Sequence, residues 1–206
     1  NNQQRIILYT NGIGSKQFDD LRSLEKKINI KNKIIISYIG NLGVAQNLSI
    51  LVKAANEFPE LRFNIVGNGK EFLKIKELAK YNNNIFFYGR LEWEELLKIY
   101  SETNILYAQL SKNFSGAMPS KLYEYLSTGK FIIYGGDGQA KKILNTFDNN
   151  CVIESDNVKA LTNKLEEVIK NNYYKRRSKT NQDKIYNLYL RESSVKKLYE
   201  FISNKN

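Results

Sequence analysis

The sequence of 206 residues contains no histidine and a single cysteine, Cys151. Without histidine, the chain can form neither a Ser-His-Asp triad nor a Cys-His pair, and it lacks the commonest zinc ligand. One cysteine cannot build a disulfide framework, and such sparing use fits a reducing compartment. Because Cys151 begins the apolar run Cys-Val-Ile, we expect it in the core rather than at a reactive site.

Long apolar runs are also missing. None approaches the about 18 residues that indicate a membrane-spanning helix, and no signal peptide is visible. The chain begins Asn-Asn-Gln-Gln, and Met118 is its only methionine. We therefore expect a fragment of a longer, cytoplasmic polypeptide, which could also lie peripherally on the inner face of the cytoplasmic membrane.

Acidic residues are outnumbered, since 21 Asp and Glu stand against 32 Lys and Arg and give a formal charge of +11. Such a surplus favours phosphate-bearing partners or an anionic membrane surface. The densest basic cluster is Lys175-Arg-Arg177 with Lys179, near the end of the chain. Because no basic stripe with regularly interleaved aromatic residues is present, we do not expect a nucleic-acid partner.

What the sequence does contain is a regular alternation of apolar runs and segments of helical period. The expected strands cover residues 5–9, 33–39, 62–66, 84–88, 104–108, 131–134 and 151–153. The expected helices cover residues 18–28, 46–58, 70–81, 92–101, 119–127, 139–147 and 158–171. This alternation predicts one α/β domain, a Rossmann-like parallel sheet with helices on both faces. The strands lack polar alternation, which agrees with burial on both sides.

Residues 173–206 form a Tyr- and Lys-rich helical appendage at the C-terminus. Two groups of apolar residues recur there at helical spacing: Ile185, Leu188 and Tyr189, then Val195, Leu198 and Tyr199. We expect one or two amphipathic helices that pack on the outside of the domain or on a missing part of the protein.

Glycine gathers in the loops that follow the expected strands, where a parallel sheet binds its ligand. These loops are Gly40-Asn-Leu-Gly43, Gly67-Asn-Gly69, Gly89-Arg90, residues 111–118 and Gly135-Gly-Asp-Gly138. Turn geometry explains part of this enrichment, since glycine tolerates positive φ. Its concentration at one edge also predicts a pocket lined by backbone.

The most informative segment runs from Pro119 to Gly129 and predicts a short helix that leads into a buried strand. Pro119 suits the first helical position, and Gly129 suits the left-handed residue that ends a helix. Leu122, Tyr125 and Leu126 fall at i, i+3 and i+4, so they would form the core-facing stripe.

Ser120, Lys121 and Glu124 carry the chemistry of this helix. The free N–H groups of Ser120 and Lys121, the helix dipole and the Lys121 ammonium favour an anion at the N-terminus. Glu124, one turn further, can accept hydrogen bonds from a diol attached to that anion. A phosphate next to a sugar is what a nucleotide offers. An ordinary amphipathic helix with a solvated Glu and Lys fits the same pattern.

These motifs, in this order, resemble the C-terminal half of GT-B glycosyltransferases, specifically the retaining glycosyltransferase family 4. The similar segments are Leu8-Tyr-Thr-Asn-Gly12 with Phe18, Tyr38-Ile-Gly-Asn-Leu-Gly43, Ile65-Val-Gly-Asn-Gly69, Ile85-Phe-Phe-Tyr-Gly-Arg90 and Pro119-Ser-Lys to Gly129. The last looks like the Pro-Ser-Lys variant of bacterial capsule and O-antigen transferases. The resemblance implies a donor-binding domain over residues 1–206. Residues 1–18 would be its crossover segment, and residues 173–206 would cross back onto an acceptor domain.

The resemblance also implies roles for individual residues. Glu124 would bind the ribose hydroxyls, and the backbone N–H groups of Ser120 and Lys121 would hold the diphosphate. The nucleoside would be framed by loop and strand-end residues: Gly40, Asn41, Gly67, Asn68, Tyr88 and Arg90.

The implied activity is transfer of a sugar from a nucleoside-diphosphate sugar, with UDP favoured, to a saccharide or lipid-linked acceptor in surface polysaccharide synthesis. The implied second partner is a missing N-terminal acceptor domain, without which this fragment would be inactive. Neither a metal nor another cofactor is expected, because no Asp-x-Asp pair marks a metal site. No catalytic residue is assigned.

Two departures from the family pattern concern the donor. Gly116 stands where the family's first signature glutamate reaches the donor sugar. Asn41 and Asn47 stand where many members carry an Arg and a Lys for the diphosphate. Two phosphates still need compensating charge, for which Lys121 is the best-placed cation and Arg90 the next. Because Gly116 offers no carboxylate, recognition of the donor sugar must differ from that in the family.

Two other interpretations stay open. A Rossmann dehydrogenase would need Gly-x-Gly-x-x-Gly after its first strand, whereas Asn11-Gly-Ile-Gly14 is followed by no third glycine. A non-catalytic, basic Rossmann-like domain that binds nucleotides or polyanions would also account for the charge.

Overall fold

A fully parallel six-stranded sheet forms the centre of the computed structural model, which describes residues 11–24 and 33–203. Its strand order is β3-β2-β1-β4-β5-β6. This is the order of a Rossmann sheet, in which the direction of winding reverses between β1 and β4. The strands are β1 (Ile35–Ile39), β2 (Arg62–Val66), β3 (Ile85–Gly89), β4 (Ile105–Gln109), β5 (Phe131–Gly135) and β6 (Asn150–Ile153).

The six expected strands within the described residues are confirmed, each to within two residues at either end. Every residue of β1, β4 and β5 is buried, as expected for strands that are covered on both faces. The strand expected at residues 5–9 lies outside the described residues.

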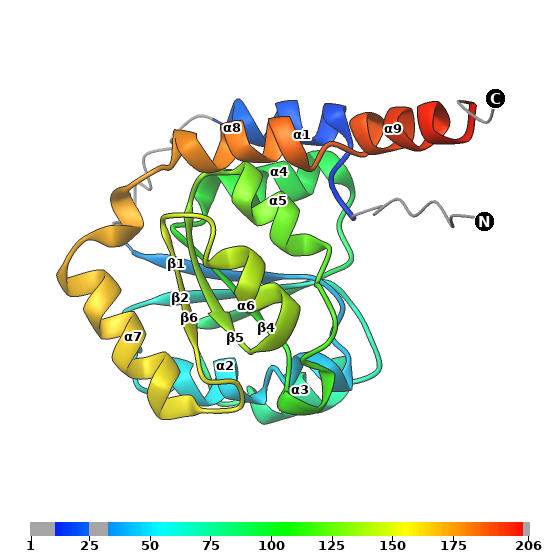
Figure 1. Cartoon of the computed structure of the whole chain (residues 1–206). Coiled ribbons are helices and arrows are strands. Elements are labelled where there is room, and N and C mark those ends of the chain that lie inside the picture. Colours follow the sequence, from blue (N-terminus) through cyan, green and yellow to red (C-terminus); the bar gives the residue numbers. More distant parts are fainter. Residues whose placement is uncertain (1–10, 25–32, 204–206) are drawn as a thin grey trace.

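Helices cover both faces of the sheet (Figure 1). One face packs against α2 (Ser49–Ala55), α3 (Phe72–Leu78) and α7 (Val158–Lys170). The other packs against α1 (Ser15–Arg22), α4 (Trp93–Glu102), α5 (Lys121–Ser127) and α6 (Gly138–Leu144). Three short 3₁₀ turns lie in the connections: η1 (Val44–Gln46), η2 (Lys112–Phe114) and η3 (Tyr173–Lys175). The Rossmann-like α/β fold is thus confirmed.

Several helices are shorter than the sequence predicts. The helix expected at 46–58 is divided into η1 and α2, because Asn47 between them takes a left-handed conformation, with φ of 36°. The helix expected at 70–81 keeps only its central turns as α3. The helix expected at 18–28 begins earlier, as α1, and its last residues, 25–28, lie outside the described residues.

The prediction that Pro119 occupies the first helical position is wrong, because α5 begins at Lys121. The N–H groups of Leu122 and Tyr123 bond to the carbonyls of Pro119 and Ser120, at 3.0 and 3.2 Å. This three-residue spacing is a 3₁₀-like turn, which precedes the first α-helical turn. The predicted end is confirmed, since Gly129 follows the helix with a φ of +66°.

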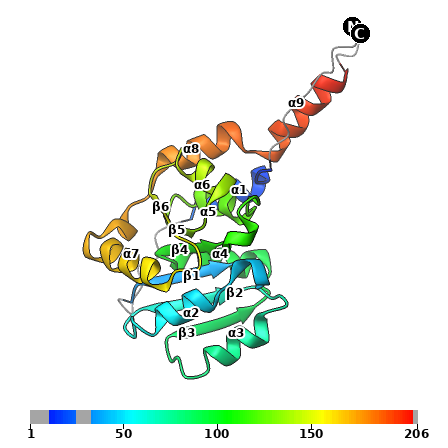
Figure 2. The same ribbon diagram turned by 60° about the horizontal axis from the view of Figure 1, so that its bottom comes forward.

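The C-terminal appendage consists of two helices with different surroundings. Helix α8 (Lys179–Leu188) packs against α5 and α1 and buries Ile185 completely. Helix α9 (Arg191–Ser203) extends away from the body (Figure 2), and it leaves Val195 and Tyr199 exposed. Within the described residues, no helix is both long and apolar enough to cross a membrane.

The first described residues pair with the segment between α8 and α9. The Ile13 N–H donates to the Tyr189 carbonyl at 3.0 Å, and the Arg191 N–H donates to the Ile13 carbonyl at 2.9 Å. Asn11-Gly-Ile-Gly14 therefore lies against the C-terminal segment and not in the loop after β1, where a dehydrogenase would need its glycine motif. This placement argues against the dehydrogenase interpretation.

Candidate functional site

The loops after β1, β2 and β3 lie edge to edge and form a surface of main chain. The Gly40 N–H donates to the Val66 carbonyl at 2.9 Å, and the Gly67 N–H donates to the Gly89 carbonyl at 2.6 Å. These bonds extend the pairing of the three strands into their loops. The structure thereby brings together three of the five predicted loop segments, at Gly40, Gly67 and Gly89.

Glycine is required at position 67 by a close approach of two loops. Gly67 has a φ of +128°, and a Cβ there would lie 1.8 Å from the Gly40 carbonyl oxygen. No side chain fits at that separation, so the two loops can approach only because residue 67 has none.

The side chains of these loops are mostly exposed, whereas their backbone groups are hydrogen-bonded. Asn41, Asn68 and Arg90 are exposed. Among the described residues, Arg90 has no carboxylate partner, so its charge is available to a ligand. The Tyr88 hydroxyl, in contrast, accepts a hydrogen bond of 2.5 Å from the Arg62 guanidinium.

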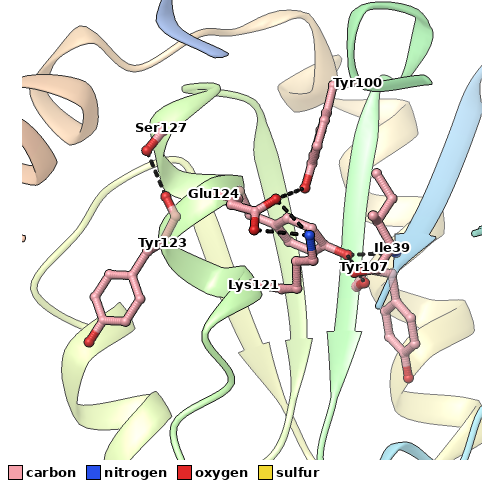
Figure 3. Close-up of polar contacts among 8 residues, drawn as sticks. Ile39, Tyr100, Tyr107, Lys121, Tyr123, Glu124 and Ser127 are labelled. Atoms are coloured by element: carbon pink, nitrogen blue, oxygen red, sulfur yellow. Dashed lines mark hydrogen bonds and ion pairs between the residues drawn. The ribbon is translucent and has the colours of Figure 1, made fainter. Parts of the chain in front are cut away.

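On α5, Lys121 and Glu124 form an ion pair that a third residue extends (Figure 3). The Lys121 ammonium bonds to both carboxylate oxygens of Glu124, at 2.9 and 2.8 Å. The Tyr100 hydroxyl, from α4, donates to Oε2 of Glu124 at 3.0 Å. The Glu124 side chain is only 15% exposed, so its charge is held by partners rather than by water.

This arrangement leaves capacity for a ligand. A carboxylate offers about four lone-pair positions and an ammonium three donors, so three hydrogen bonds exhaust neither group. Burial, and then the Glu124 charge, raise the pKa of Tyr100 well above its usual value. Tyr100 therefore stays protonated, and a donor to Glu124, at neutral pH.

Hydrogen bonds attach helix α5 to the end of β1, next to the first glycine loop. The Tyr125 hydroxyl accepts a hydrogen bond from the Ile39 N–H at 2.8 Å and lies 3.1 Å from the Ile39 carbonyl. Ile39 ends β1 and precedes Gly40. Because the loop after β4 leads into α5, the N-terminus of α5 and the glycine loops lie at the same carboxyl edge of the sheet, where such folds bind ligands.

The N-terminus of α5 and the loop before it remain accessible. Ser120 and Gly116 are exposed, and nothing lies within 4 Å of the position that a Cβ of Gly116 would take. The expected face division of α5 is confirmed, because Leu122, Tyr125 and Leu126 are completely buried.

Asn47 is tied into the protein rather than directed at a ligand. Its amide donates to the Asp156 carboxylate at 2.6 Å. The same carboxylate accepts from the Gln109 amide at 3.4 Å and from the Lys112 N–H at 3.2 Å. Neither Asn41 nor Asn47 supplies positive charge, so Lys121 and Arg90 remain the cations of the predicted site.

Sequence reasoning missed two residues of this neighbourhood, Tyr100 and Asp156. Tyr100 belongs to the apolar stripe of α4, and nothing in its local sequence points to a partner 24 residues away. Asp156 connects the first glycine loop to the end of β6. Within residues 11–24 and 33–203, no group of three or more His, Cys, Asp or Glu side chains could hold a metal ion.

Comparison with known proteins decides the family. The sequence pattern of "Glycosyl transferases group 1" matches residues 21–185. The chain belongs to this family. It is also 28% identical, over 106 residues, to sulfoquinovosyl transferase SQD2 of Arabidopsis thaliana, a match that covers 49% of this chain and 21% of that protein.

Solved structures with the same fold include three bacterial proteins at low sequence identity. Sucrose-phosphate synthase of Thermosynechococcus elongatus matches with a TM-score of 0.78 and 16% identity, over 97% of this chain and 53% of that one. HepE of Anabaena, solved with UDP and glucose, matches with a TM-score of 0.73 and 16% identity, over 94% and 55%. A glycosyltransferase of Rickettsia africae matches with a TM-score of 0.72 and 16% identity, over 97% and 58%. This chain thus spans about half the length of these proteins.

Proposed function

We propose that this chain is the donor-binding half of a retaining glycosyltransferase of the family 4 type. It binds a nucleoside-diphosphate sugar, whose sugar passes to a saccharide or lipid-linked acceptor in surface polysaccharide synthesis. The observation that carries this proposal is the Lys121–Glu124 pair, fixed by Tyr100, on a helix that Tyr125 attaches to the end of β1, just before Gly40. Membership of the group 1 family supports it.

Each part of the site has a task in this proposal. Glu124 accepts hydrogen bonds from the ribose hydroxyls. The Lys121 ammonium and the N–H groups of Ser120 and Lys121 stabilise the diphosphate as it leaves, which is the main catalytic contribution of this half. The glycine loops at Gly40–Asn41 and Gly67–Asn68, with Tyr88 and Arg90, frame the nucleoside. The chain's own groups suffice for this task without a metal or another cofactor.

The nucleotide favoured is UDP. HepE, which shares the fold, was solved with UDP and with UDP-glucose. The sugar is recognised differently from most of the family, because Gly116 offers no carboxylate and the space around it is open.

The acceptor domain precedes this chain in the whole protein. Residues 1–18 and 173–206 act as the two crossovers, a role supported by the pairing of Ile13 with Tyr189 and Arg191. Since one lobe cannot bring two substrates together, the chain alone binds the donor and transfers no sugar. The whole enzyme works in the cytoplasm or peripherally on the inner face of the cytoplasmic membrane.

Isothermal titration of the chain with UDP, GDP and their sugars tests this proposal. Saturable binding of one nucleotide, competed by the matching nucleotide sugar, is expected. The competing interpretation, a non-catalytic polyanion-binding domain, predicts instead that binding follows only ligand charge and salt concentration. Sugar transfer by this chain alone would contradict the division of labour between two halves.

A further inference from the structure

A cavity of about 530 Å³ lies at the opposite edge of the sheet from the glycine loops. Its walls come from the beginnings of β5 and β6, from α7, from η3 and from the segment that leads into α8. Four cationic side chains line it, namely Lys164, Arg176, Arg177 and Lys179, against two acidic ones, Asp148 and Glu167. Its volume lies within the range of small-molecule sites.

Most of this positive charge is not compensated within the described part of the chain. Lys164 pairs with Glu167 at 2.5 Å, but no carboxylate contacts Arg176, Arg177 or Lys179. The Arg176 guanidinium lies over the Tyr173 ring, 4.6 Å from its centroid. The unpaired cations therefore outnumber the one remaining acid, Asp148.

Arg177 shows how the lack of a counter-charge affects a buried cation. Its Nη1 donates to the Leu24 carbonyl at 2.7 Å, whereas its buried Nη2 has no hydrogen-bond partner among residues 11–24 and 33–203. Burial lowers the pKa of this guanidinium, because the charged form has lost water and gained no counter-charge. A nearby anion would offset that cost.

The basic segment is held in place by the main chain around it. The Ser178 N–H donates to the Gly129 carbonyl at 2.8 Å. The Asn149 amide donates to the same carbonyl at 2.9 Å and to the Arg176 carbonyl at 3.3 Å. A site whose backbone is fixed in advance loses less entropy when it binds a ligand.

We infer that this cavity is a second anion site, which binds a phosphate group through Arg176, Arg177 and Lys179. Guanidinium groups bind phosphate with two parallel N–H donors, and an ammonium adds a point charge. Of the first N–H groups of α8, that of Asn181 already bonds to the Ser178 hydroxyl at 3.0 Å, whereas those of Lys179 and Thr180 have no acceptor inside the helix. The phosphate belongs either to a soluble compound or to an anionic lipid headgroup, and this site is separate from the proposed donor site.

The test compares two double variants of the whole chain. Arg176→Gln with Lys179→Gln removes two exposed cations from the cavity. Lys53→Gln with Lys98→Gln removes two exposed cations elsewhere, on α2 and α4, and so controls for net charge. Each is titrated with inorganic phosphate and pyrophosphate, with and without UDP, and followed by ¹⁵N–¹H NMR. Equal melting temperatures verify folding, and Lys179→Gln alone serves as a milder variant.

In the parent chain, phosphate should shift the amide signals of residues 148–151 and 176–180, with UDP present or absent. The cavity variant should bind pyrophosphate about tenfold more weakly, while the control variant should match the parent, on the scale of one or two charge-assisted contacts. UDP affinity should be the same in both variants, so failure here leaves the donor proposal untouched. Equal losses in both variants, or shifts spread over all basic surfaces, would overturn the inference.

Vesicles separate the two sources of phosphate. If the ligand is a lipid headgroup, the cavity variant should also lose about tenfold of its binding to phosphatidylglycerol vesicles relative to the control variant. If the ligand is soluble, both variants should bind these vesicles equally, and only the phosphate titration should differ. Phosphatidylcholine vesicles, which carry no net charge, should bind none of the three proteins.

Discussion

At the ends of β1, β2 and β3 the candidate donor site consists of main chain, whereas on α5 it consists of side chains. In the loops, Gly40 and Gly67 approach so closely that a single added carbon would collide with a carbonyl. On α5, a carboxylate, an ammonium and a hydroxyl hold one another at 2.8 to 3.0 Å. The loop part of the site thus requires a position without a side chain, whereas the helix part requires charged and polar side chains.

This difference predicts two separable kinds of damage. A substitution in the loops must move the backbone, so it should lower the free energy of unfolding along with ligand affinity. A substitution on α5 changes a partly exposed polar group, so it should lower affinity and leave stability nearly unchanged.

The largest expected effect is that of Gly67→Ala on stability. The new Cβ would collide with the Gly40 carbonyl oxygen, and alanine disfavours a φ of +128°. Backbone strain and overpacking together should cost about 3 kcal/mol of unfolding free energy, measured by urea denaturation. Gly116→Ala is the matched control, because its Cβ would meet nothing within 4 Å. If both variants unfold like the parent, the loops are not locked together as described.

The next effect is that of Lys121→Ala on nucleotide affinity. Lys121 is the cation closest to the N-terminus of α5, and a charge-assisted contact contributes about 1.5–3 kcal/mol. UDP binding measured by calorimetry should therefore weaken about ten- to a hundredfold, with a nearly unchanged melting temperature.

Lys80→Ala provides the control for this prediction. Lys80 also pairs with a glutamate three residues away, Glu77, but just beyond the C-terminal end of α3. It should bind UDP like the parent. Should Lys121→Ala do the same, Lys121 is a solvated helix residue and not part of a diphosphate site.

The sheet could be predicted from the sequence because each strand is a short, largely apolar run. Residues 131–134 (Phe-Ile-Ile-Tyr) are an example, bounded by Lys130 and Gly135. The predicted helix ends were less accurate. Pro119 and Asn47 take part in local turns that delay the start of a helix, and the spacing of apolar residues does not reveal such turns.

The side-chain part of the candidate site could be predicted only where its residues are neighbours in sequence. Ser120, Lys121 and Glu124 share one helix, so their proximity follows from the helical repeat. The contact of Tyr100 with Glu124 depends on how α4 and α5 lie side by side on the sheet. The bond between Asn47 and Asp156 likewise joins the loops after β1 and β6. No local pattern encodes either contact.

Glu124→Gln should have a smaller effect than Lys121→Ala, because the amide keeps one acceptor oxygen. UDP affinity should fall about tenfold, and the melting temperature should stay near that of the parent. The parent should also discriminate against 2′,3′-dideoxy-UDP, and the variant should do so less. Glu77→Gln on α3 is the control. Equal affinity of parent and variant for UDP would mean that Glu124 does not bind the ribose.

The smallest expected effect is that of Tyr100→Phe. This substitution tests whether the helix part of the site depends on its polar side chains. Removing the hydroxyl leaves Glu124 with its Lys121 partner but without the bond that fixes Oε2. Affinity for UDP should fall about fivefold, equivalent to ~1 kcal/mol. Because Tyr100 acts through Glu124, the effect should vanish in the Glu124→Gln background, as a double-mutant cycle would show.

A tyrosine on the other side of α5 shows whether the loss is specific. Tyr123 packs against Tyr189, with ring centroids 5.1 Å apart, and its ring points away from the Glu124 carboxylate (Figure 3). Tyr123→Phe should therefore bind UDP like the parent. If Tyr100→Phe and Tyr123→Phe weaken binding equally, or if the Tyr100 effect persists without the Glu124 carboxylate, then Tyr100 only supports the packing of α4 against α5. Glu124 would then be oriented by its own helix and by Lys121 alone.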